Sequence, residues 1–323
     1  MPRSKTDHGF SGRGLTALVL LPLLVLGCET RVSSEHSVLV EPLDGEGAAG
    51  GAPSEWQSHS MGYTNLVTPR WSPGGDLILA RGTRGVGLYL LAAADGEVLY
   101  AEEGYHGDAI FDHDGSICRG TTEGATIITV DTESRQVTPT DIPCNVAVVD
   151  ERLGERIHSG PRGEVYHNAY RGTVTLVSER GREEQIEDRG AWNVAVSNDG
   201  RRIAWSLGTL ITPELFVYDA WTGVSSVGRG AHPTWSPDGR YLVYSVPDIE
   251  VRQAGGQSYR ADLNIYDAEQ DRVLPMSRTS EVAEMQPRFS PDGRRIVFAD
   301  WDSGVITMAP FVSPGQEEGG HGR

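Results

Sequence analysis

The chain has 323 residues and a formal net charge of −17, with 28 basic residues against 45 acidic ones. A body this acidic repels nucleic acid and anionic head groups, so the charge excludes a nucleic-acid-binding protein. Lys5 is the only lysine, and every other basic side chain is arginine; lysine catalysis and P-loop chemistry are therefore excluded beyond the N-terminal segment.

The first elements in chain order are those of an export signal. Arg3, Lys5 and Arg13 precede an apolar core from Leu15 to Leu26, which is too short to span a bilayer and is typical of a signal peptide. The segment ends in Val-Leu-Gly-Cys28, which resembles the bacterial lipobox. We expect residues 1–27 to be a lipoprotein signal peptide and Cys28 to carry the lipid; an ordinary signal peptide with a chance cysteine is the alternative.

Residues 28–54 are rich in serine, glycine and acidic side chains, a composition typical of a flexible tether. Glu29 replaces the aspartate that retains enterobacterial lipoproteins at the inner membrane. The resemblance therefore implies an exported protein anchored at the outer membrane and facing the periplasm, with the cell surface as the alternative. Membrane contact is expected through the N-terminal lipid only.

From residue 72 onward the chain repeats one phrase, a small residue and two turn residues before a glycine and an apolar run. Repeats about 40 residues apart indicate a propeller or a solenoid. The copies begin at Ser72, Asp112, Gly160, Ser197, Ser236 and Ser290.

Within each copy the sequence predicts a hairpin followed by two more strands. Pro237 and Asp238 suit the corners of a type I turn, and Gly239 suits the left-handed position that closes it. A third strand and a polar turn to a fourth follow each copy, with no helical periodicity. We predict an all-β fold, a six-bladed β-propeller of four-stranded antiparallel blades spanning residues 55–312.

The sixth blade lacks an outer strand, because only a short polar tail follows Met308, and residues 313–323 are expected to be disordered. A ring must close or it leaves unpaired edges. We therefore expect an N-terminal strand, within residues 36–41 or 55–64, to complete the last blade.

The phrase Trp/Phe-Ser-Pro-Asp-Gly followed by a β-branched run, as at Trp235 and Phe289, resembles the TolB-like, PD40 (WD40-like) β-propeller family over about residues 64–310. The second and third copies depart from the pattern. The resemblance implies a propeller that serves as a binding platform or as the non-catalytic domain of a peptidase.

The mature chain has two more cysteines, Cys118 and Cys144. Both fall in or directly after the second blade, and export permits a disulfide, which the spacing leaves open. The sequence has no nucleophile elbow, no zinc-protease motif and no P-loop, so we expect no enzyme activity, no cofactor and no metal.

One column of polar residues recurs four positions before each repeated turn. In a propeller the first strand is innermost, so such a column forms a ring at one mouth of the central channel. A water-filled channel is lined by polar side chains whatever its function. The column is therefore either ordinary channel lining or a candidate binding site. Its members are Thr68, Asp108, Arg156, Asn193, His232 and Gln286.

A second candidate is the insertion at residues 246–261 in blade five. Arg252, Tyr259 and Arg260 are side chains typical of protein contacts, and a mobile loop is the alternative. We expected this loop to emerge on the same face as the polar column.

These features favour a non-enzymatic, lipid-anchored binding module of the bacterial cell envelope that presents channel rim and loop to a protein or peptide. One alternative is a channel-mouth enzyme such as a carbohydrate lyase or hydrolase, with the rim residues as acid and base. Another is a lipoprotein that captures a small ligand or carbohydrate in a pocket lined by aromatic side chains.

Overall fold

The computed structural model describes residues 57–59, 66–82, 86–107, 109–112, 114–121, 124–131, 133–144, 149–251, 257–279 and 282–314. The expected signal peptide, Cys28, the tether, and the sites Asp108 and Arg252 lie outside these residues. No helix within the described ranges is both long and apolar enough to cross a membrane.

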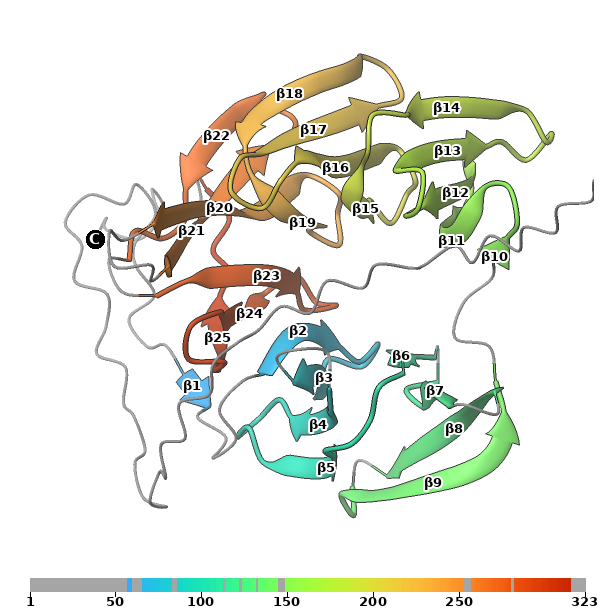
Figure 1. Ribbon diagram of the computed structural model, residues 1–323, viewed down its shortest axis with the longest axis vertical. Helices are drawn as coiled ribbons and strands as arrows, with labels where there is room; N and C mark the ends of the chain where they lie inside the picture. The colour runs from blue at the N-terminus through green and yellow to red at the C-terminus, as the bar shows by residue number, and fades with distance from the viewer. Residues whose placement is uncertain are drawn as a thin grey trace, which may run out of the picture. The chain divides into compact units, whose positions relative to one another are not determined.

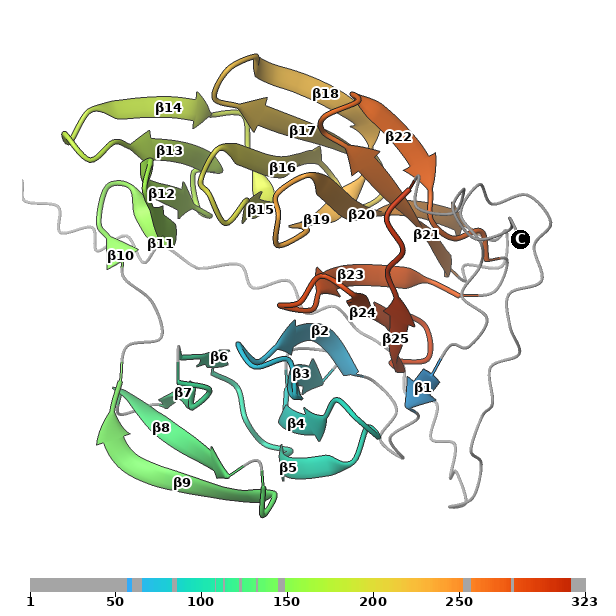
Figure 2. The same cartoon turned by 180° about the vertical axis from the view of Figure 1, so that it is seen from behind.

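The described chain folds into six antiparallel sheets in a propeller arrangement, as predicted (Figures 1 and 2). The first two blades are β2 (Leu66–Trp71), β3 (Leu77–Gly82), β4 (Leu88–Ala92) and β5 (Val98–Glu102), then β6 (Ala109–Phe111), β7 (Ile117–Thr121), β8 (Gly124–Asp131) and β9 (Gln136–Pro143). The third and fourth are β11 (Gly154–Gly160), β12 (Gly163–Asn168), β13 (Thr173–Val177) and β14 (Glu183–Glu187), then β15 (Trp192–Val196), β16 (Arg202–Gly208), β17 (Pro213–Asp219) and β18 (Gly223–Arg229). The last two are β19 (Ala231–Trp235), β20 (Tyr241–Val251), β21 (Gln257–Asp267) and β22 (Arg272–Pro275), then β23 (Glu284–Phe289), β24 (Arg295–Asp300) and β25 (Ile306–Pro310) with β1 (Gln57–His59).

Blade three carries one strand more than predicted. The two-residue strand β10 (Val149–Asp150) pairs with β11. The Asp150 carboxylate accepts hydrogen bonds from the backbone N–H groups of Arg152 and Leu153, and this local turn returns the chain alongside itself.

The repeated phrase builds one turn between the first two strands of a blade. In three copies the serine hydroxyl donates to the aspartate two residues later, and the backbone N–H five residues after the serine donates to that hydroxyl oxygen. The turn glycines take φ values between 67 and 85° in five copies, and Gly163 of the third copy has a φ of 121°; these values favour glycine because it lacks a Cβ. The serine–aspartate pairs are Ser197–Asp199, Ser236–Asp238 and Ser290–Asp292, and the backbone donors are Arg202, Tyr241 and Arg295.

The hydrophobic core lies between the blades rather than inside one sheet. Five clusters of buried side chains each fill the space between two successive blades. Leu66 and Ile78 of blade one, for example, pack with Val297 and Met308 of blade six. Each sheet therefore depends on its neighbours for burial of its apolar faces.

An N-terminal strand closes the last blade, as predicted. Strand β1, within the segment 55–64, pairs antiparallel with β25, and Gln57, Ser58 and His59 lie opposite Met308, Thr307 and Ile306 (Figures 1 and 2). Blade six is thus assembled from both ends of the propeller sequence, which ties the first described residues to the last strand.

Cys118, in β7, and Cys144, directly after β9, form a disulfide with their Cα atoms 5.9 Å apart. The bridge joins residues 26 positions apart in the sequence. It therefore closes most of blade two into a covalent loop, which restricts the unfolded chain.

Deleting residues 1–60, which removes β1, should destabilise the propeller because β25 loses its pairing partner and keeps buried apolar side chains at a new edge. At about 1 kcal/mol for each net hydrogen bond lost, we expect about 2 kcal/mol. For a chain of this size the melting temperature should fall by roughly 4–8 °C.

Differential scanning calorimetry of this variant against one lacking only residues 1–54 isolates the strand. Equal melting temperatures would show that β1 contributes nothing to closure.

Candidate functional site

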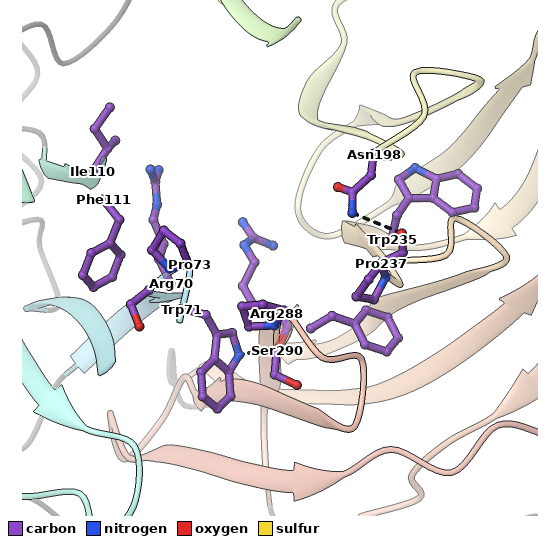
Figure 3. A pocket seen from close by; sticks show the side chains of 13 residues that line it. Arg70, Trp71, Pro73, Ile110, Phe111, Asn198, Trp235, Pro237, Arg288 and Ser290 are labelled. Carbon is purple, nitrogen blue, oxygen red and sulfur yellow. Dashed lines mark hydrogen bonds between the residues drawn. The ribbon is translucent and has the colours of Figure 1, made fainter. Parts of the chain in front are cut away.

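A pocket opens at the end of the inner strands where the repeated turns lie. Its volume is about 590 Å³, and five of the six blades line it (Figure 3). We call it the turn-side mouth; its lining residues are Arg70, Trp71, Ser72, Pro73, Ile110, Phe111, Asn198, Trp235, Pro237, Arg288, Phe289, Ser290 and Pro291.

The inner strands supply the two charged side chains of the turn-side mouth. Arg70 lies two residues before the turn of blade one, and Arg288 occupies the same place in the neighbouring blade six. Arg70 is exposed and Arg288 is half-buried. Among the described residues that line the pocket there is no acidic side chain, so the mouth is cationic on an acidic protein.

Aromatic side chains form much of the wall, and two of them also link blades. The Trp71 indole Nε1–H donates to the backbone oxygen of Arg288 at 3.1 Å, and that of Trp235 donates to the backbone oxygen of Ala195 at 3.3 Å. The only polar atom of each indole is therefore hydrogen-bonded to the backbone, and the ring forms an apolar part of the pocket wall.

The predicted polar column turns out to mark a backbone feature. Thr68, Asn193, His232 and Gln286 all have positive φ, between 50 and 57°, a conformation that non-glycine residues rarely adopt. At each of them the inner strand has two residues opposite one on its neighbour, which is a β-bulge. None of the four lines the turn-side mouth. Two positions after Thr68 and Gln286, however, Arg70 and Arg288 do.

The members of the polar column have different surroundings. The Thr68 N–H donates to Gln286 Oε1 at 2.7 Å, which links blades one and six. Asn193 is exposed. His232 is buried, and its ring lies 5.9 Å from that of Trp192 in an edge-to-face arrangement.

Burial, together with the nearby Arg288 charge, lowers the pKa of His232 to about 3. The imidazole is therefore neutral at physiological pH, and its Nδ1 has no hydrogen-bond partner among the described residues. A neutral, buried ring outside the pocket lining is poorly placed for the acid–base role of the enzyme hypothesis.

Arg156 was assigned to the column in the wrong register. The turn of blade three pairs Gly160 directly with Gly163, so it is shorter than the other turns, and the bulge falls at Ile157. Arg156 instead takes the paired position before the bulge and forms an ion pair with Glu164 across the hairpin. Its charge is thus engaged within the blade.

The insertion at residues 246–261 is largely a continuation of two strands. β20 and β21 stay paired from Val246 opposite Asp262 to Val251 opposite Gln257. Tyr259 lies opposite Ile249 in this ladder, and Arg260 is exposed. Because the hairpin leaves blade five at the end opposite the turn after β19, it lies on the other face from the turn-side mouth.

A buried acid lies at that other end of blade six. Glu284, the first residue of β23, is 1% exposed, and the Ser277 hydroxyl donates to its carboxyl group. Burial raises the pKa of Glu284 to about 8, and the Asp262 carboxylate adds to the rise. The sequence offered no signal for this group, because it depends on the packing of blade five against blade six.

No cluster of three or more potential metal ligands occurs among the residues that the structure describes. The chemistry that the turn-side mouth offers is therefore recognition by guanidinium groups, aromatic rings and prolines.

Comparisons with known proteins identify the fold of the chain but assign it to no family. No family model and no curated protein matches the chain. Among solved structures, the β-propeller domain of Cps50 (Swd1) from Myceliophteria thermophila matches 80% of this chain and 100% of its own, at 11% identity and a TM-score of 0.52. Identity this low shows the fold alone.

Two bacterial structures match with lower TM-scores. Hydrazine synthase of Kuenenia stuttgartiensis covers 77% of this chain and 79% of its own, at 15% identity and a TM-score of 0.42. TolB from Acinetobacter baumannii covers 77% of this chain and 55% of its own, at 18% identity and a TM-score of 0.31. This chain thus matches just over half of that TolB.

Replacing Glu284 by glutamine should change how stability depends on pH. The folded state keeps a proton that the unfolded state releases, so the wild-type contribution is present at low pH and is lost as the pH rises from about 4.5 to about 8. Glutamine is neutral throughout. The variant should gain on the order of 5 kcal/mol relative to wild type across this window.

Urea unfolding of both proteins over this pH range measures the difference. His232 contributes the opposite slope, since stability is lost as the pH falls from 6.5 towards 3, but it is common to both proteins and cancels. A difference that stays constant with pH would contradict the raised pKa of Glu284.

Proposed function

We propose that this chain is a non-enzymatic binding module of the bacterial cell envelope, related to the TolB-like, PD40 propellers. An N-terminal lipid at Cys28 anchors it, and its turn-side mouth takes a protein or peptide partner. The localisation rests on the export signal and on the lipobox-like Val-Leu-Gly-Cys28.

The lining of the turn-side mouth is the observation that carries this proposal. Trp71, Phe111, Trp235 and Phe289 surround Arg70 and Arg288 in one pocket. Aromatic and arginine side chains are the types that dominate the energy of protein interfaces. A rigid ring of sheets presents them without the entropic cost of ordering a loop.

The aromatic wall also supports a second candidate, capture of a small ligand or carbohydrate. Four aromatic side chains line the pocket, which is the lining expected for that function. The channel-mouth enzyme has less support, because its proposed base, His232, is buried and neutral.

A photoreactive amino acid at Asn198, exposed at the turn-side mouth, should cross-link to the partner when the full chain is expressed in its envelope. Val273, exposed on the outer strand β22, is the control for random contact, and Arg260 tests the hairpin face. We expect one adduct from Asn198 and none from Val273.

An adduct from Arg260 alone would place the interface on the hairpin face and contradict a site at the turn-side mouth. Equal labelling from all three positions would contradict a specific interface. A carbohydrate in place of a protein adduct would favour the second candidate.

Replacing Cys28 by alanine should release the protein from the membrane fraction, because the membrane affinity is proposed to come from the lipid alone. Fractionation with palmitate labelling measures the change, and Cys118→Ala in the same assay is the matched control. Retention of unlabelled Cys28→Ala protein in the membrane would contradict lipid anchoring at this residue.

A further inference from the structure

Arg70 and Arg288 form no ion pair within the described residues, although they lie side by side in the lining of one pocket. Eight other arginines form ion pairs within the described residues, with one carboxylate or two each. Acidic residues outnumber basic ones by 45 to 28, so partners are abundant. The paired arginines are Arg119, Arg135, Arg152, Arg156, Arg189, Arg201, Arg202 and Arg240.

The two unpaired charges also act on each other. Burial lowers the pKa of Arg288 to about 10, and the positive charge of Arg70 contributes to the decrease. The hydrogen bond that Arg288 makes within the described residues goes to the backbone oxygen of Pro287, at 2.9 Å. Two neighbouring guanidinium groups without a counter-charge are destabilised, and a bound anion removes that cost.

The other polar groups of the turn-side mouth are already engaged in the turns. The Ser72 hydroxyl donates to Asp76 and the Ser290 hydroxyl to Asp292. The Asn198 side-chain amide donates to the backbone oxygen of Pro237 at 3.1 Å. A ligand in this pocket therefore meets two cationic forks beside aromatic rings and prolines.

We propose that Arg70 and Arg288 form a carboxylate-binding subsite, and that the partner inserts a peptide carboxylate flanked by apolar side chains into the turn-side mouth. This inference rests on the proposed function. Guanidinium groups match a carboxylate through paired, charge-assisted hydrogen bonds. Aromatic rings and prolines, here Phe111, Trp235 and Pro237 among them, pack against the flanking apolar groups.

The engaged serines and asparagine favour a peptide over an acidic sugar. A uronate oligosaccharide carries the same carboxylate, but its many hydroxyl groups lose water on binding and need partners. The hydroxyl donors that would serve them, on Ser72 and Ser290, are committed to the turns, and one N–H of the Asn198 amide is bonded to Pro237. A peptide with leucine-like side chains has no such requirement beside its carboxylate.

Fluorescence anisotropy of the full chain with a dye-labelled peptide of alternating glutamate and leucine tests the subsite. Arg70→Gln should weaken binding by about tenfold or more. Arg70 is exposed, so this variant should fold, and its melting temperature verifies that. Arg288→Lys keeps the charge without the planar fork and should give an intermediate loss.

Arg272→Gln is the matched control, since Arg272 is exposed on the outer strand β22 and its loss changes the net charge equally. It should alter affinity by less than about twofold. The same peptide with glutamine in place of glutamate should bind about tenfold more weakly to the wild type. Its affinity should not change in Arg70→Gln.

Three results would overturn the subsite. The two peptides could bind equally, the acidic peptide could fail to bind, or Arg70→Gln and Arg272→Gln could lose affinity equally. Tetragalacturonate could compete as strongly as the unlabelled peptide and lose this effect in Arg70→Gln. That result would overturn the assignment of a peptide as the ligand. If the Asn198 adduct forms while the peptide result is negative, the carboxylate inference fails and the proposed function stands.

Discussion

The rest of the structure depends on hydrogen bonds that join neighbouring blades at the end where the repeated turns lie. In blades four and six, the arginine two residues after the turn glycine donates to the backbone oxygen of the turn glycine in the next blade. Arg202 reaches Gly239 in this way at 2.6 Å, and Arg295 reaches Gly75 at 3.1 Å. The Arg295 guanidinium also lies 4.8 Å from the centre of the Trp71 ring. Since the turns of blades one, four, five and six form part of the wall of the mouth, these bonds help to set the spacing of the wall.

The bulges in the inner strands explain why this wall carries charge. A bulge inserts one extra residue and changes which side chains point to each face. At Thr68 and Gln286 it precedes Arg70 and Arg288, which line the mouth. Residues held at positive φ cost of order 1–3 kcal/mol each. The hydrogen bond between the Thr68 N–H and Gln286 Oε1 offsets part of this cost in blades one and six.

Charge is distributed unevenly over the protein. The chain as a whole is acidic, yet the lining of the turn-side mouth contains two arginines and no acid among the described residues. The acids gather elsewhere, as in the buried Glu284 and in the ion pairs of blades three to five. Such a pattern attracts an anionic group to one place while the rest of the surface repels it.

The sequence alone determined the propeller, because its cause is local. A proline or small residue, an aspartate and a glycine at fixed spacing form the same turn at Ser197, Ser236 and Ser290, and β-branched runs on both sides form strands. Closure by an N-terminal strand also followed, since a ring with an unpaired edge is unstable.

The tertiary structure alone decided which polar residues face the pocket. A strand pattern has a period of two, and a single bulge shifts that period by one residue, so the sequence predicts Thr68 and Gln286 as rim residues where the structure has Arg70 and Arg288. The shorter turn of blade three displaced Arg156 in the same way. The pairing of Cys118 with Cys144 and the protonation of Glu284 depend on distances between strands and between blades, which sequence spacing does not encode.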